Sequence, residues 1–190
     1  MSRLWLVRHG PTHARAMVGW TDVAADLSDV HALSRLHGLL PGAPVVSSDL
    51  RRAVATGDAL APRPRLPSLP ALRELHFGAW ERLTWDEAAR ADPVLARDFL
   101  DRPGDVRPPG GESWNAMAGR VNDTLDGLAR AHEELIVVAH FGPIVAAVAR
   151  AAGLSTAQAL ALRIAPLSVS EIVLDPQGGP ALVRRIGDCP

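Results

Sequence analysis

The sequence predicts an α/β fold, a three-layer sandwich in which helices flank a mainly parallel sheet. Two patterns predict it: short apolar runs typical of buried strands, and intervening segments with apolar residues at helical spacing. The chain has 190 residues, of which 47% are hydrophobic and 22% are charged, and these proportions are ordinary for a globular protein. We therefore expect a single domain over residues 1–190 that buries a core of its own.

The expected strands are short and apolar. The first, Leu4–Val7, ends at Arg8-His9-Gly10-Pro11, where Gly and Pro end regular structure. The clearest one, Leu135–Ala139, ends at His140. The others are Pro44–Val46, Val169–Leu174 and Ala181–Ile186, the last two around a Gly-Gly turn, and Leu72–Phe77 could add a short extended piece.

Helices are expected between these strands. The apolar spacing favours helices over Ser28–Leu40, Leu50–Leu60 and Ser113–Ala131. Thr84–Glu87 fits a capping box, so a helix should begin there, and Pro143 suits the first residue of a helix after His140. Pro and Gly predict connectors over Ala61–Pro70 and Asp101–Gly111, and we expect residues 78–111 to form a short insertion over the active site.

The composition excludes several kinds of chemistry. All 20 cationic residues are Arg, and the sequence contains neither Lys nor Tyr, which excludes a Schiff-base lysine and the lysine of a nucleotide-binding phosphate loop. The single cysteine, Cys189, cannot form an intramolecular disulfide. Arg is well suited to binding phosphate, because its planar fork donates two hydrogen bonds at once.

Charge and hydropathy bear on partners and location. The net charge is -1, so no basic field attracts nucleic acid or an anionic membrane. No run of about 18 apolar residues appears, and the N-terminal apolar segment lacks the small-residue cleavage site of a signal peptide. We therefore expect no nucleic-acid or membrane partner and a cytoplasmic location.

The chemistry-bearing residues follow strand ends. His9 and His140 each come directly after a predicted strand, and the second strand leads within a few residues to Arg51 and Arg52. Because ligands of open parallel sheets bind beyond the carboxyl ends of the strands, we expect these side chains to meet at one crevice. Imidazoles with several guanidinium groups suit a phosphate ester, because phosphoryl transfer depends mainly on positioning and electrostatic stabilisation.

Several short motifs carry a resemblance to a known family. Arg8-His9-Gly10 after an apolar strand resembles the defining motif of the histidine phosphatase superfamily, which includes the cofactor-dependent phosphoglycerate mutases. A single match is weak, but matches in the family's order along most of the chain are strong, and the resemblance implies a phosphoglycerate mutase-like fold. The further matches are Val18–Asp22 with Asp26–Ser28, Ser48–Ala53 with Thr56, Leu72–Leu75 with Phe77–Glu81, Pro109–Ser113 and Val137–His140.

The resemblance implies a role for each matching residue. His9 would be the nucleophile that forms a phosphohistidine; it must be neutral, and flanking arginines disfavour its protonated form. Arg8, Arg52 and His140 would hold the phosphoryl oxygens, with His140 as a charged donor in the transition state. Glu74 would give a proton to the leaving alkoxide and then activate water. No metal or cofactor is expected.

The segment after the first motif departs from the family pattern. The family often has Glu-Thr or Glu-Ser after Arg-His-Gly and an Asn about three residues later, whereas here Pro11-Thr12 follows and Arg15 takes the Asn position. We expect Thr12, Arg15 and Gly19 to bind substrate. Arg15 would favour a more anionic substrate, or else point to solvent. These changes do not alter the expected reaction, but they leave the identity of the substrate undetermined.

The segment Phe77–Glu81 and the short stretch between Trp80 and Gly110 resemble the phosphatase branch, for example the α-ribazole phosphatases, because mutases generally carry a longer insertion. We therefore predict a histidine acid phosphatase-type phosphoric monoester hydrolase, a metal-independent phosphomonoesterase that acts on a small phosphate ester. The alternatives are a phosphoglycerate mutase-like phosphotransferase and a non-catalytic phospholigand-binding domain. Members of this family are often dimers, so the resemblance leaves a homodimer open.

Overall fold

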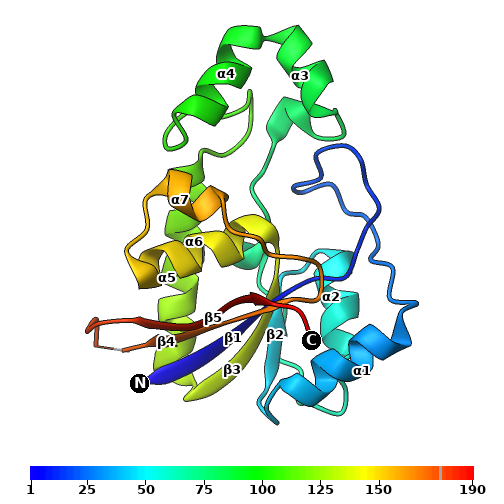
Figure 1. The fold of residues 1–190 in the computed structure, drawn as a ribbon, viewed down its shortest axis with the longest axis vertical. Coiled ribbons are helices and arrows are strands. Elements are labelled where there is room, and N and C mark those ends of the chain that lie inside the picture. Colours follow the sequence, from blue (N-terminus) through cyan, green and yellow to red (C-terminus); the bar gives the residue numbers. More distant parts are fainter. Residues whose placement is uncertain (176) are drawn as a thin grey trace.

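The computed structural model describes residues 1–175 and 177–190, and these contain one five-stranded sheet between two layers of helices (Figure 1). The strand order is β2-β3-β1-β4-β5, so the two strands that precede the histidines, β1 and β3, lie side by side. The α/β sandwich is therefore confirmed. The strands are β1 (Ser2–Arg8), β2 (Val45–Ser47), β3 (Glu134–Ala139), β4 (Val169–Leu174) and β5 (Leu182–Asp188).

The sheet is mixed rather than mainly parallel. β1 pairs with β3 and β2 pairs with β3 in parallel, but β1 pairs with β4 and β4 pairs with β5 antiparallel. A short connection joins β4 to β5, and such a connection permits only antiparallel neighbours, because a parallel pair needs a crossover of a dozen or more residues. The parallel part is the half of the sheet that carries the candidate site.

Each face of the sheet has its own apolar core. On β3, Ile136 and Val138 pack in one cluster with Leu36 of α1 and Ala53 of α2, whereas alternate residues such as Val137 face the other cluster. This alternation follows from the two-residue period of a strand. The first face is covered by α1 (Val30–Leu39) and α2 (Arg51–Asp58), and the second by α5 (Trp114–Ala131) and α6 (Phe141–Ala152).

The starts of two helices and one possible extended piece were predicted wrongly. α1 begins at Val30 rather than Ser28, because the Asp29 side chain caps it by accepting from the Ala32 N–H. α6 begins at Phe141, so Pro143 is its third residue, where a missing N–H is still tolerated. The piece Leu72–Phe77 is no strand: a 3₁₀ turn covers Pro70–Leu72 and the rest has no regular structure.

The segment 78–111 projects from the sandwich at one end of the molecule (Figure 1). It contains the predicted capping box at Thr84, which opens α3 (Trp85–Ala91), and a second helix, α4 (Pro93–Asp101), in a place where the sequence predicted none. Two backbone hydrogen bonds, Ala79 N to Pro109 O and Glu112 N to His76 O, close its base at 2.8 and 2.9 Å. We call this base, residues 76–79 and 109–112, the neck.

A further short helix, α7 (Thr156–Leu160), also went unpredicted and lies against α6. Its capping box at Ser155 and Gln158 is a signal that the sequence carried. Among residues 1–175 and 177–190, no helix combines the length and the apolar character that a membrane crossing needs.

Candidate active site

His9 lies just past the carboxyl end of β1 and is 7% exposed. Its Nδ1 is 2.7 Å from the Gly10 carbonyl oxygen. A carbonyl oxygen can only accept, so Nδ1 carries the proton and donates it. The second ring nitrogen, Nε2, is therefore unprotonated and carries a lone pair.

His140 follows β3 and is fully buried. Its ring centroid is 5.0 Å from that of His9, because β1 and β3 are parallel neighbours that end at the same edge of the sheet. Its Nε2 is 2.6 Å from the Ser48 hydroxyl, and its Nδ1 accepts a hydrogen bond from Arg52. In the neutral ring this fixes the proton on Nε2, which donates to Ser48.

Arg52 joins the two histidines. Its Nε–H lies 3.2 Å from both His9 Nε2 and His140 Nδ1, and the residue is 1% exposed. The remaining guanidinium nitrogens donate to the backbone carbonyls of Gly19, at 2.6 Å, and of Thr21, at 3.0 Å. A buried guanidinium needs such partners, and here they also fix its orientation.

Thr56 connects the helix that carries Arg52 to the segment that follows β1. It lies one turn after Arg52 on α2, and its hydroxyl donates to the Arg52 carbonyl at 2.7 Å. The same oxygen accepts the Gly10 N–H at 3.0 Å. The helix is thereby bound to the residue that follows His9.

The electrostatics of this cluster favour neutral imidazoles. Burial lowers the pKa of His9 to about 3, and the charges of Arg52 and Arg8 act in the same direction, against the hydrogen bond with Gly10. Burial likewise places the pKa of His140 well below its ordinary value, and His9 and Arg52 add to that shift. Burial beside an arginine therefore disfavours a positive charge on His140 in this arrangement of side chains, and its expected role as a charged donor in the transition state stays a prediction.

Glu74 lies at the amino end of α6. Its Oε1 accepts the Leu75 N–H at 2.9 Å and the Gly142 N–H at 3.0 Å. A Cβ on Gly142 would come within 2.3 Å of that oxygen, so the close approach requires glycine. Burial raises the pKa of Glu74 above its ordinary value, although these hydrogen bonds and the charges of Arg52 and Arg8 oppose it. A carboxyl group in this state can hold a proton for transfer.

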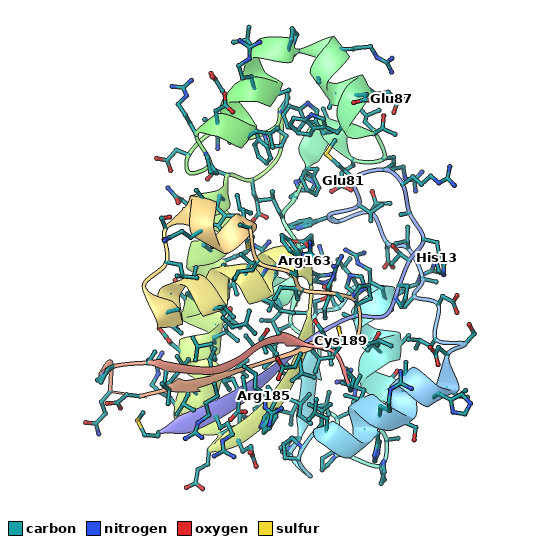
Figure 2. All side chains as sticks on the ribbon, viewed as in Figure 1. His13, Glu81, Glu87, Arg163, Arg185 and Cys189 are labelled. Carbon is teal, nitrogen blue, oxygen red and sulfur yellow. The ribbon has the colours of Figure 1, made fainter. Side chains whose placement is uncertain are left out.

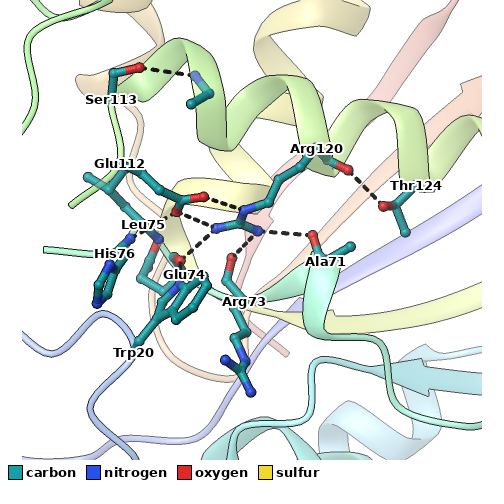
Figure 3. Close-up of polar contacts among 11 residues, drawn as sticks. Trp20, Ala71, Arg73, Glu74, Leu75, His76, Glu112, Ser113, Arg120 and Thr124 are labelled. Carbon is teal, nitrogen blue, oxygen red and sulfur yellow. Dashed lines mark hydrogen bonds and ion pairs between the residues drawn. The ribbon is translucent and has the colours of Figure 1, made fainter. Parts of the chain in front are cut away.

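A second arginine fixes the backbone on which Glu74 sits (Figure 3). The Arg120 guanidinium donates to the carbonyls of Ala71, Arg73 and Glu74 at 2.8–2.9 Å and pairs with the Glu112 carboxylate at 2.7 Å. The Trp20 indole N–H also donates to the Glu74 carbonyl, at 2.8 Å. These contacts bind the Glu74 segment to α5 and to the N-terminal loop.

Glu81, labelled in Figure 2, holds residues 19–21 through its carboxylate. Its carboxylate accepts the backbone N–H groups of Gly19, Trp20 and Thr21 at 2.7–3.1 Å, and the Thr21 hydroxyl at 2.6 Å. Partial burial raises the pKa of Glu81, but these bonds outweigh it and lower the pKa overall. Arg52 binds the carbonyls of this loop while Glu81 binds its N–H groups.

The structure places the remaining predicted residues as follows. Arg8 is half-buried; its guanidinium donates to the Ile164 carbonyl at 2.5 Å and lies 5.7 Å from the Phe141 ring centroid. Gly19 contributes its backbone, and a Cβ there would lie 2.0 Å from the Leu75 carbonyl. Thr12 is half-buried and Arg15 is exposed, and within the described residues neither forms a hydrogen bond with the histidine cluster.

Sequence reasoning missed three residues that organise this site: Ser48, Glu81 and Arg120. Ser48 and Glu81 lie inside the motifs that carried the family resemblance, so only their contacts were unknown. No sequence pattern pointed to Arg120, because an arginine on a helix is usually exposed to solvent. Among the residues that the structure describes, no group of three or more His, Cys, Asp or Glu side chains is placed to hold a metal ion.

The chain is similar to proteins of one known family. The family model of the histidine phosphatase superfamily (branch 1) matches residues 4–186. The chain is 37% identical to a glucosyl-3-phosphoglycerate phosphatase of Mycolicibacterium vanbaalenii, over 80% of this chain and 75% of the relative. It is 30% identical to an adenosylcobalamin/alpha-ribazole phosphatase of Salmonella typhimurium, over 78% of each chain.

Other similar proteins support the fold and show how much of a relative's length this chain covers. The solved structure of YhfR from Bacillus stearothermophilus superposes with a TM-score of 0.88 at 26% identity, over 99% of this chain and 98% of that one. Mycobacterial proteins, among them bifunctional protein Rv2228c of Mycobacterium tuberculosis, are 35% identical over 98% of this chain. The chain spans 54% of the length of those relatives.

Proposed function

Because this chain belongs to the histidine phosphatase superfamily, we propose that it is a metal-independent phosphomonoesterase that hydrolyses a small phosphate ester through a phosphohistidine on His9. The observation that carries this proposal is the shared Arg52 Nε–H, which lies 3.2 Å from His9 Nε2 and from His140 Nδ1. A phosphoryl oxygen that accepts this N–H would free the lone pair of His9 Nε2 for attack. The relatives named as phosphatases support hydrolysis over phosphoryl transfer to a second substrate.

In the first step, His9 Nε2 would attack phosphorus while the bond to the ester oxygen breaks. The proton of Glu74 would pass to the leaving oxygen, which departs as an alcohol. In the second step, the Glu74 carboxylate would take a proton from water as its oxygen attacks the phosphohistidine. Inorganic phosphate leaves, His9 is neutral again, and Glu74 is again protonated.

The transition state carries negative charge on the equatorial phosphoryl oxygens. Arg8 and Arg52 would supply fixed positive charge beside them. A phosphate dianion next to His140 would raise the pKa of that ring, so proton uptake on substrate binding would turn His140 into the charged donor. Thr12, Arg15 and the backbone of Gly19 remain candidates for contacts with the rest of the substrate.

Release of inorganic phosphate from a panel of monoesters, with chelator present, tests the proposal. We expect turnover by wild type and by His31→Ala, an exposed control on α1, and a loss of at least three orders of magnitude in His9→Ala. Rapid quenching of turnover with a ³²P-labelled ester should trap label on wild type and none on His9→Ala. Turnover that persists in His9→Ala, or that stops with chelator, would overturn the proposal.

The panel also separates the alternatives. Interconversion of phosphoglycerates without phosphate release would favour a mutase-like phosphotransferase. Binding of phosphate ligands with no turnover of any kind would favour a non-catalytic phospholigand-binding domain.

A further inference from the structure

An apolar cavity of about 190 Å³ adjoins the candidate site. Its wall is almost wholly apolar, and the Glu74 carboxyl is the one ionisable group among its described lining residues. The segment 78–111 supplies one side and the start of α6 the other. The side chains that shape it are Phe99, Leu100, Val106, Trp114, Phe141 and Leu160.

Two lining residues connect this cavity to the phosphate-binding cluster. Phe141 lines the cavity, and its ring centroid lies 5.7 Å from the Arg8 guanidinium. Glu74 lines it as well, and this carboxyl group is the proposed proton donor to the leaving oxygen. A leaving oxygen within hydrogen-bond reach of Glu74 therefore directs the rest of the leaving group into the cavity.

We propose that this cavity, the leaving-group pocket, binds an apolar leaving group, such as one aromatic ring or an alkyl chain of about six carbons. This inference rests on the proposed function. The size is suitable because an apolar cavity of about 150 Å³ in another protein holds benzene. The rim supports the same class of ligand, since Leu100 and Leu160 are 57% and 38% exposed and gain from being covered.

The same wall disfavours charged leaving groups. A carboxylate on the alcohol, as in phosphoserine or a phosphoglycerate, would lose its water of hydration inside the pocket and find no cation among the described lining residues. It would also face Glu74 once that residue has given up its proton. The pocket therefore selects the substrate by the polarity of its alcohol.

A series of primary alkyl phosphates tests this selection, because ethyl, butyl and hexyl phosphate share the same leaving chemistry. We expect kcat/KM to rise about fourfold for each added methylene that the pocket buries, and hexyl phosphate to exceed phosphoserine. Leu100→Glu and Leu160→Glu should lower kcat/KM for hexyl phosphate at least tenfold more than for ethyl phosphate. Val94→Glu is the matched control on α4, because Val94 is 71% exposed and does not line the pocket.

Three outcomes would overturn the inference while leaving the phosphatase proposal intact: equal kcat/KM along the series, an unchanged series in Leu100→Glu, or a preference for phosphoserine. Failure of the proposed function looks different, because no ester would then release phosphate. In that case thermal shifts with ethylphosphonate and hexylphosphonate test the pocket directly. A larger shift with hexylphosphonate in wild type, absent in Leu100→Glu, supports the pocket, and equal shifts refute it.

Discussion

Arg52 is the residue on which the candidate site depends most. Its Nε–H bridges the two imidazoles, and its other nitrogens bind the carbonyls of Gly19 and Thr21. An ammonium group cannot reproduce this geometry, because its donors radiate from one atom, whereas those of a guanidinium lie in a plane on three nitrogens. Charge alone is therefore not what this position supplies.

Replacing Arg52 with Lys should lower kcat/KM by a factor of about 10²–10³, the effect of removing one preorganised donor to a transition-state oxygen. The neighbouring residue gives a matched control, because the Arg51 side chain is 64% exposed and pairs with Asp22. Arg51→Lys should keep its activity. Steady-state kinetics on one ester compares the two variants, and equal activities would show that charge suffices at position 52.

Glu74 is the proposed proton donor, and its burial also makes the stability of the folded protein depend on pH. Its pKa is raised by burial, so the stability that it contributes is complete below the ordinary pKa of a glutamate and decreases as pH rises. Glu74→Gln should therefore raise Tm more at about pH 7.5 than at about pH 4, while lowering kcat by a factor of about 10²–10⁴. Thermal unfolding at both pH values measures this, with Glu133→Gln as an exposed control. An equal change in Tm at both pH values would contradict it.

At the scale of elements, the neck determines where segment 78–111 sits. The chain passes through it at Gly78, where φ is +52° and an added Cβ would lie 2.2 Å from the Pro109 carbonyl oxygen. Gly110, across the neck, also has a positive φ, +69°, but no atom lies within 4 Å of an added Cβ. An alanine at Gly110 would meet backbone strain alone, whereas an alanine at Gly78 would meet both strain and a steric clash.

Gly78→Ala should destabilise the protein by on the order of 1–3 kcal/mol more than Gly110→Ala, because only the first adds a steric clash to the strain. Denaturant unfolding gives the two free energies. Hydrogen exchange should show faster exchange in α3 and α4 of Gly78→Ala. Equal destabilisation by both substitutions would mean that the neck tolerates the added methyl group.

At the scale of the whole molecule, two buried imidazoles link folding to pH. Burial lowers the pKa of His9 to about 3 in the folded protein, whereas an unfolded chain binds this proton below about pH 6.5. Between those pH values the unfolded state holds more protons. The free energy of unfolding therefore falls as pH falls through this range.

Between about pH 6.5 and pH 4.5, His9 alone should remove about 2 kcal/mol from the free energy of unfolding. His9→Gln lacks this contribution, so its stability should fall less than that of wild type over the same range, by that difference. His140 and Glu74 titrate in both proteins, so the comparison reports His9 together with its effect on the pKa of His140. Urea unfolding at both pH values measures the difference, and His31→Gln should behave as wild type. An identical pH dependence of wild type and His9→Gln would show that His9 is protonated in the folded protein.

Local patterns in the sequence were enough to predict the sandwich and the meeting of His9, Arg52 and His140. Strand patterns are local, and parallel neighbours end at one edge, so residues that follow apolar strands converge wherever the sheet forms. The capping box at Thr84 was equally local. These features needed only the order of residues along the chain.

Tertiary structure decided the remainder, because it depends on contacts between distant segments. The antiparallel pairing of β1 with β4 and the hydrogen bonds of Glu81 and Arg120 could not be derived from local pattern. The neutral state of His140 is of the same kind: its pKa is set by burial and by His9 and Arg52, which lie 131 and 88 positions away in the chain. A charge state depends on what surrounds a group in space, and the sequence order of those neighbours does not reveal it.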